Sequence, residues 1–180
     1  EISACLVGSE MCIREDPDMQ PSLFDNLMSC GCWVKKVLDT NPYLQKVCIV
    51  GAAEKLIKAL HPIMEKIKFY SETELSHEEG WNRFSHEHLN ELVYISVDKD
   101  VLDIKSAVTN WDQGSLSLTE LEKLLSIILK KEEIIGVDIC GECSSSLDVF
   151  QKNRELSINS KANKELLNLF LSNQNEIHPL

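Results

Sequence analysis

The stretch that most constrains the fold is a strand-like run at residues 91–103, ELVYISVDKDVLD, which contains three aspartates at its end. Its leucine, valine, tyrosine and isoleucine residues form a nearly continuous block, the pattern of a strand buried on both faces of a parallel sheet. Because side chains alternate along a strand, Asp98 and Asp100 are predicted on one side and Lys99 on the other, with Asp103 in the loop beyond. The sequence therefore predicts a central strand that ends in a pair of carboxylates.

This pair of carboxylates has two interpretations. Open α/β sheets bind ligands beyond the carboxyl ends of their strands, and carboxylate oxygens suit Mg, Mn or Ca better than soft metals. A cation between Asp98 and Asp100 would relieve their repulsion. The alternative is an ordinary strand-to-helix loop whose acids are solvated, and the pattern alone does not decide between the two.

Strand-like and helix-like segments alternate along the rest of the chain. Further strands are predicted at residues 47–51, 67–70 and 134–139, and helices over residues 22–38, 53–66, 117–131 and 163–171. The 117–131 helix starts with the capping box Ser117-Leu118-Thr119-Glu120. This alternation predicts a three-layer α/β sandwich with a mostly parallel sheet.

Composition limits the number of domains, the kinds of partner and the cellular compartment that can be expected. A chain of 180 residues with 43% hydrophobic and 26% charged residues is expected to form one globular domain. Its net charge of -11 argues against a nucleic-acid partner, which needs a basic face. We find no apolar run of about 18 residues, so no membrane partner is expected. Seven cysteines, an odd number, are typical of reduced thiols and predict a cytoplasmic protein.

The N-terminal segment differs in character from the rest. The chain begins at Glu1, and residues 3–14, SACLVGSEMCIR, resemble a translated adaptor sequence. We therefore predict that residues 1–15 are not native and that residues 16–180 form a single α/β domain. The alternative is a genuine segment that forms a short helix or strand.

Three motifs in order resemble the ureohydrolase superfamily, which comprises arginases, agmatinases and formimidoylglutamases. Residues 96–103, SVDKDVLD, resemble its S-x-D-x-D-x-x-D signature, residues 109–120 its Thr- and Gly-containing loop, and residues 135–142, IGVDICGE, its penultimate strand and glutamate. The resemblance implies an arginase-like fold that lacks its N-terminal strands. It also implies a Mn-dependent hydrolase that acts on linear C–N bonds of a small guanidino, amidino or formimino substrate.

The resemblance also implies roles for individual residues. Asp98 would bridge two Mn ions, with Asp100 a ligand of one and Asp18 a ligand of the other. Glu142 would pair with the cationic nitrogens of the substrate, although it lies one residue later than the family pattern has it. Cys30, before Gly31, would take the place of a histidine that shuttles protons. The implied catalytic residues are thus Asp18, Cys30 and Glu142.

Two departures from the family pattern leave the implied metal site incomplete. In the D-x-H-x-D motif that ends at Asp18, Arg14 and Asp16 take the places of the first aspartate and the histidine. A further histidine belongs to an earlier strand, and we expect no strand before Asp16. The chain is therefore expected to be inactive, with an exposed sheet edge and possible homo-oligomerisation. The alternative function is a non-catalytic protein of the same fold.

Overall fold

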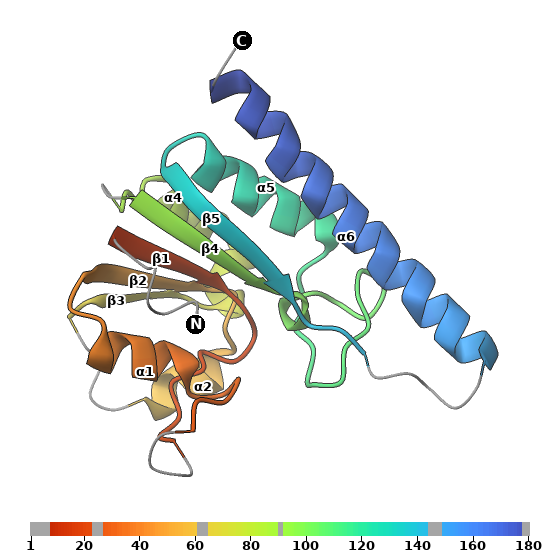
Figure 1. Ribbon diagram of the computed structural model, residues 1–180, viewed down its shortest axis with the longest axis horizontal. Helices are drawn as coiled ribbons and strands as arrows, with labels where there is room; N and C mark the ends of the chain where they lie inside the picture. The colour runs from red at the N-terminus through yellow and green to blue at the C-terminus, as the bar shows by residue number, and fades with distance from the viewer. Residues whose placement is uncertain (1–7, 23–26, 61–64, 90–91, 144–148, 178–180) are drawn as a thin grey trace.

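The protein consists of a parallel sheet between two layers of helices (Figure 1). The computed structural model describes residues 8–22, 27–60, 65–89, 92–143 and 149–177. The strands are β1 (Gly8–Ile13), β2 (Leu44–Val50), β3 (Ile67–Tyr70), β4 (Leu92–Asp98) and β5 (Glu133–Cys140). The helices are α1 (Trp33–Thr40), α2 (Glu54–Ala59), α3 (Glu72–Leu75), α4 (Glu78–Ser85), the 3-10 turn η2 (Lys99–Val101), α5 (Leu118–Leu129) and α6 (Val149–Ile177).

The strand order is β3-β2-β1-β4-β5, and every neighbouring pair is parallel. This confirms the predicted three-layer α/β architecture. The expectation that no strand precedes Asp16 is wrong, because residues 8–13 form β1 in the middle of the sheet. β4 is therefore an interior strand that lies next to the central one. β3 and β5 form the two edges of the sheet.

Two hydrophobic cores, one on each face of the sheet, hold the layers together. On β1, Met11 and Ile13 belong to one core and Cys12 to the other, as the alternation of side chains along a strand requires. The larger core joins the sheet to α4, α5 and α6, with Phe84, Leu124 and Leu166 at its centre. The smaller core joins it to α1 and α2 (Figure 1).

The helices differ from the predictions mainly at their ends. α5 starts as predicted, because Ser117 and Glu120 form the capping box. α1 begins only at Trp33, and α2 already ends at Ala59, where Leu60 adopts an extended conformation. α6 has 29 residues, many more than the predicted 163–171, and its start leads away from the sheet (Figure 1). None of the described helices is long and apolar enough to span a membrane.

An ion pair between a buried lysine and a half-exposed glutamate helps to attach α6 to the rest of the fold. The side chain of Lys99, 0% exposed, forms an ion pair with Glu142, and its Nζ lies 2.8 Å from Asn163 Oδ1 on α6. Asn159, also on α6, donates to Glu142 Oε2 at 2.9 Å and accepts from the Val108 N–H at 2.8 Å. Polar groups buried at this junction are thus satisfied across three segments.

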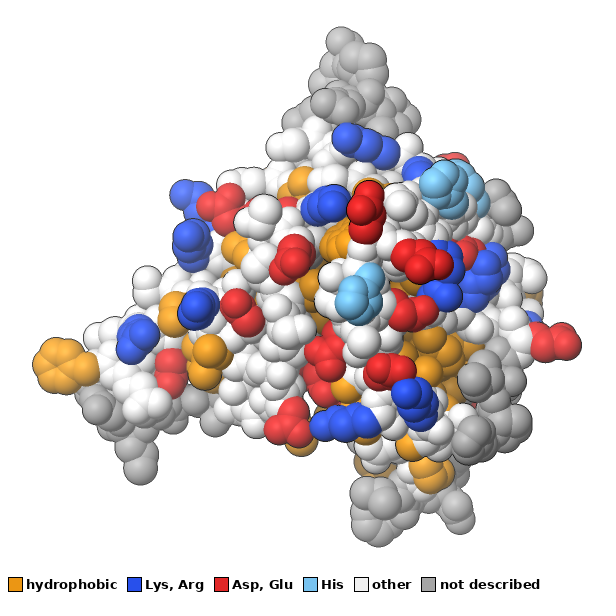
Figure 2. Space-filling view, turned by 180° about the vertical axis from the view of Figure 1, so that it is seen from behind, with side chains coloured by type: hydrophobic (Ala, Val, Ile, Leu, Met, Phe, Trp, Pro, Cys, Tyr) orange, Lys and Arg blue, Asp and Glu red, His pale blue; other side chains and the backbone are white. Residues whose placement is uncertain are grey.

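The exposed surface carries charges of both signs. Seen from the side opposite to Figure 1, acidic and basic side chains are interspersed (Figure 2). Ion pairs between exposed side chains include Lys35 with Asp39 at 2.8 Å and Arg83 with Glu74. Exposed pairs of this kind contribute little to stability, so the buried charges matter more.

The central strand β1 buries a carboxylate, that of Glu10. Glu10 is fully buried in β1, and neither of its carboxylate oxygens has a hydrogen-bond partner among the described residues. Burial raises the pKa of Glu10 to about 7, and the nearby Arg14 guanidinium only partly offsets this. A buried carboxylate without partners destabilises the fold when it is charged.

We predict that Glu10→Gln stabilises the protein at neutral and higher pH. The unfolded Glu10 loses its proton near pH 4.5 and the folded one near pH 7, so its contribution to stability falls as pH rises between these values. The shift corresponds to about 3 kcal/mol. Thermal unfolding should show a higher Tm for Glu10→Gln at pH 8 than for the original chain, and no difference near pH 4. A gain of the same size in Glu133→Gln, at an exposed position of β5, would contradict this explanation.

We also predict that Lys99 and Glu142 are energetically coupled. Glu142→Ala leaves the buried ammonium of Lys99 with only Asn163, which should cost about 2 kcal/mol. The double variant Lys99→Met/Glu142→Ala should be more stable than Glu142→Ala alone, because no unpaired charge remains. Urea unfolding measures the free energy of unfolding of both variants. Additive losses in the double variant would show that the pair is not coupled, and Lys35→Ala, from an exposed pair with Asp39, is the control.

Candidate functional site

Polar side chains gather around Arg14, at the carboxyl ends of β1 and β4. Arg14 directly follows β1, is 3% exposed and forms an ion pair with Asp18 through Nη1. The same nitrogen lies 4.0 Å from Asp98 Oδ2 at the end of β4. The other terminal nitrogen, Nη2, donates to Ser96 Oγ at 2.9 Å. Parallel strands end at the same edge of a sheet, so groups distant in sequence meet here.

The loop after β1 and the first residue of α1 complete the arrangement. Asp18 adopts a left-handed backbone conformation, φ 52°, and its N–H donates to Asp16 Oδ1 at 2.8 Å. Its carboxylate accepts from Trp33 Nε1 at 2.6 Å, and the Trp33 ring lies 4.8 Å from the Arg14 guanidinium carbon. We call Arg14, Asp18, Trp33, Ser96 and Asp98 the Arg14 cluster.

The carboxylates of this region are set in a poorly solvated environment. Burial raises the pKa of Asp18, while the Arg14 guanidinium acts in the opposite direction. Asp138 on β5 accepts from Ser96 Oγ at 3.1 Å, and burial raises the pKa of this carboxyl as well. The positive charge of Arg14 therefore offsets part of the cost of burying these acids.

Asp100 lies in a 3-10 turn and not on the strand itself. β4 ends at Asp98, and Lys99–Val101 form a 3-10 turn, so alternation does not extend to Asp100. Its N–H donates to Asp98 Oδ1 at 3.1 Å. Its own Oδ1 is buried without a partner among the described residues, and burial raises its pKa. Asp103 accepts from the N–H groups of Lys105 and Ser106 and so caps the following turn.

Glu142 faces Lys99 and α6, as described above, and its pairing with a substrate stays a prediction. Gly141 explains its position. It has φ +81°, and a Cβ there would lie 2.6 Å from Asp98 Oδ1 and 2.8 Å from the backbone nitrogen of Lys99. Only glycine allows the chain to pass this closely to the end of β4.

Two cysteines lie near the start of α1, and the catalytic role that the resemblance implies for Cys30 stays a prediction. Cys30 is exposed in the turn before the helix. Cys32 is buried at the start of α1, and its sulfur lies 3.2 Å from both the N–H and the hydroxyl of Ser29. These hydrogen bonds lower the pKa of the Cys32 thiol. Because the helix was expected to begin at residue 22, the sequence did not indicate that Cys32 precedes its first turn.

The Arg14 cluster does not fit a pair of Mn ions as it stands. The guanidinium lies against Asp18 and within 4.0 Å of Asp98, in the place where two of the implied ligands would need a metal. Over the described ranges, no group of three or more His, Cys, Asp or Glu side chains is arranged to hold a metal ion. That Asp18, Asp98 and Asp100 bind metal therefore stays a prediction.

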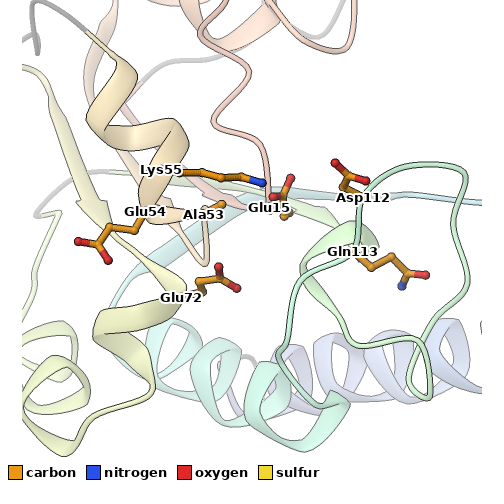
Figure 3. Close-up of a pocket in the computed structure, with 7 residues that line it drawn as sticks. All are labelled: Glu15, Ala53, Glu54, Lys55, Glu72, Asp112 and Gln113. Carbon is orange, nitrogen blue, oxygen red and sulfur yellow. The ribbon is translucent and has the colours of Figure 1, made fainter.

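A separate hollow lies at the carboxyl ends of β1, β2 and β3 (Figure 3). It has a volume of about 440 Å³ and is lined by residues from four segments of the chain, Glu15, Ala53, Glu54, Lys55, Glu72, Asp112 and Gln113. Lys55 points toward Glu15, whose pKa is raised by burial (Figure 3). The carboxylates in its lining outnumber the single ammonium, so the hollow favours cations over anions.

The sequence of this chain is similar to those of known proteins. The arginase family model matches residues 17–160. The chain is 36% identical over 118 residues to an uncharacterized protein of Thermotoga maritima, and the match covers 66% of this chain and 42% of that protein.

Two crystal structures share the fold. The agmatine ureohydrolase of Thermoplasma volcanium has a TM-score of 0.72 at 20% identity, and the match covers 97% of this chain and 57% of that one. The formimidoylglutamase of Bacillus subtilis has a TM-score of 0.71 at 17% identity, covering 97% and 55%. The chain thus spans about half the length of these proteins. Since the family match covers most of its residues, this chain belongs to the arginase family.

Proposed function

We propose that the longer protein represented by this chain is a Mn-dependent hydrolase of linear C–N bonds in guanidino, amidino or formimino compounds. The observation that carries the proposal is that Asp18 and Asp98, which are 80 positions apart by their numbers, converge on one cation at the carboxyl edge of the sheet. Membership of the arginase family supports the same reading, and Mn is the metal that this family implies.

The chain itself is proposed to be inactive. Arg14 supplies a permanent positive charge between the two carboxylates that would bind metal, and a second cation would be repelled there. Glu142, the proposed substrate contact, is engaged by Lys99, Asn159 and Asn163. No step of hydrolysis is therefore assigned to the residues as they stand.

The second candidate is a non-catalytic protein of the same fold. The same guanidinium favours it, because it already places a positive charge between Asp18 and Asp98. The two candidates differ in what the gene encodes before Pro17. An aspartate and a histidine in the places of Arg14 and Asp16 would favour the hydrolase, and their absence from the longer protein would favour the alternative.

We predict that the purified chain releases no urea, formamide or ammonia from arginine, agmatine or formiminoglutamate, even with excess Mn²⁺. The physical reason is the occupied cation position at Arg14. Product assays over hours provide the measurement, with Asp98→Asn as the test variant and Asp112→Asn, in the separate hollow, as its matched control. Mn-dependent turnover that Asp98→Asn abolishes and Asp112→Asn preserves would show that the chain is active.

The double variant Arg14→Asp/Asp16→His is predicted to gain Mn²⁺ binding. It removes the resident cation and adds a carboxylate and an imidazole beside Asp18 and Asp98, both suitable Mn ligands. Isothermal titration should detect binding at micromolar to millimolar Mn²⁺ in this variant and none in the original chain. If the variant folds, as judged by circular dichroism, and still binds no Mn²⁺, the assignment of Asp18 and Asp98 as ligands is wrong.

A further inference from the structure

Both terminal nitrogens of the Arg14 guanidinium have partners, while Nε is buried without one among the described residues. One side meets the carboxylate of Asp18, the other donates to the hydroxyl of Ser96, and Asp98 lies 4.0 Å away. The Trp33 ring lies 4.8 Å from its central carbon, within the range of a cation–π contact. Trp33 also donates to Asp18, which fixes the carboxylate against the guanidinium.

A second arginine provides a direct comparison within the same chain. Arg83 also forms an ion pair, with Glu74, and also lies over an aromatic ring, 4.7 Å from the centroid of Tyr70. Its side chain is 54% exposed, whereas that of Arg14 is 3% exposed. Each site thus combines an ion pair with an aromatic ring, and the two differ in solvation, which decides how much each charge contributes to stability.

We propose that Arg14 is the structural cation of this carboxylate cluster, and that its guanidinium takes the place of a metal ion in holding Asp18 and Asp98 together. The part of the chain that the family model matches, residues 17–160, supplies Asp18, Trp33, Ser96 and Asp98, and residue 14 supplies the cation. Asp18, Trp33, Ser96 and Asp98 thus form a binding site for a guanidinium group, and Arg14 of the same chain occupies it. This inference does not depend on whether any longer protein is a hydrolase.

The first test uses the unaltered chain. Because the cluster already contains its cation, millimolar Mn²⁺ and a chelator such as EDTA should each leave the Tm unchanged within about 1 °C. A Tm that rises with Mn²⁺, or falls with the chelator, would overturn the proposal, because it would show that the fold binds a metal.

The second test removes the guanidinium from its binding site. Arg14→Ala leaves Asp18 and Asp98 without a buried counter-charge and should lower the Tm by about 10 °C. Millimolar methylguanidinium should recover part of this loss, because it offers the same planar donors to Asp18 and Ser96. Methylammonium at the same concentration should recover less, since it lacks the planar fork.

The matched control is Arg83→Ala, which should lower the Tm by no more than about 2 °C and show no recovery. Two outcomes would overturn the proposal. One is a decrease in Tm for Arg14→Ala no greater than that for Arg83→Ala. The other is an equal recovery of the Tm of Arg14→Ala by methylguanidinium and methylammonium. If Arg14→Ala does not fold, Arg14→Lys and Arg14→Met replace it. Lysine keeps the charge and should lose less than methionine, and equal losses would show that the charge is not what holds the cluster.

Discussion

Repulsion among carboxylates at the ends of parallel strands is the constraint on which the rest of this structure depends. β1 and β4 end side by side, and this brings Asp18 and Asp98 together in a poorly solvated place. The fold offsets this repulsion with two buried cations that contact different acids. Arg14 contacts Asp18 and Ser96, and Lys99 contacts Glu142 and Asn163 in the middle of α6. Cores above and below the sheet hold both arrangements in place.

Much of the fold could be predicted because several segments are locally unambiguous. The β-branched runs of β4 and β5 and the capping box of α5 indicate one structure each, and the structure confirms them. β1 could not be predicted, since Ser9 and Glu10 are polar residues at the centre of a sheet. The family match begins at residue 17, after this strand. That residues 1–15 are not native stays a prediction.

The site could be predicted only in part, because its contacts are distant in sequence. Resemblance to the family indicated Asp18 and Asp98, which do meet. Alternation did not indicate that the strand ends at Asp98 and that Asp100 lies in a 3-10 turn. The contact of Glu142 with a substrate, which the resemblance implies, stays a prediction, and nothing local in the sequence indicates that Lys99, 43 positions earlier, is its partner. The role of Arg14 was equally hidden, because Ser96 lies 82 positions away.

The guanidinium of Arg14 has one property that no bound ion shares. An arginine side chain keeps its proton at any pH at which proteins fold, and it cannot diffuse away from the chain that carries it. A metal site fills and empties with the supply of ions in its surroundings, and competing ligands can strip it. Here the cation is covalently part of the chain that it stabilises, so neither dilution nor a competing ligand can empty the site.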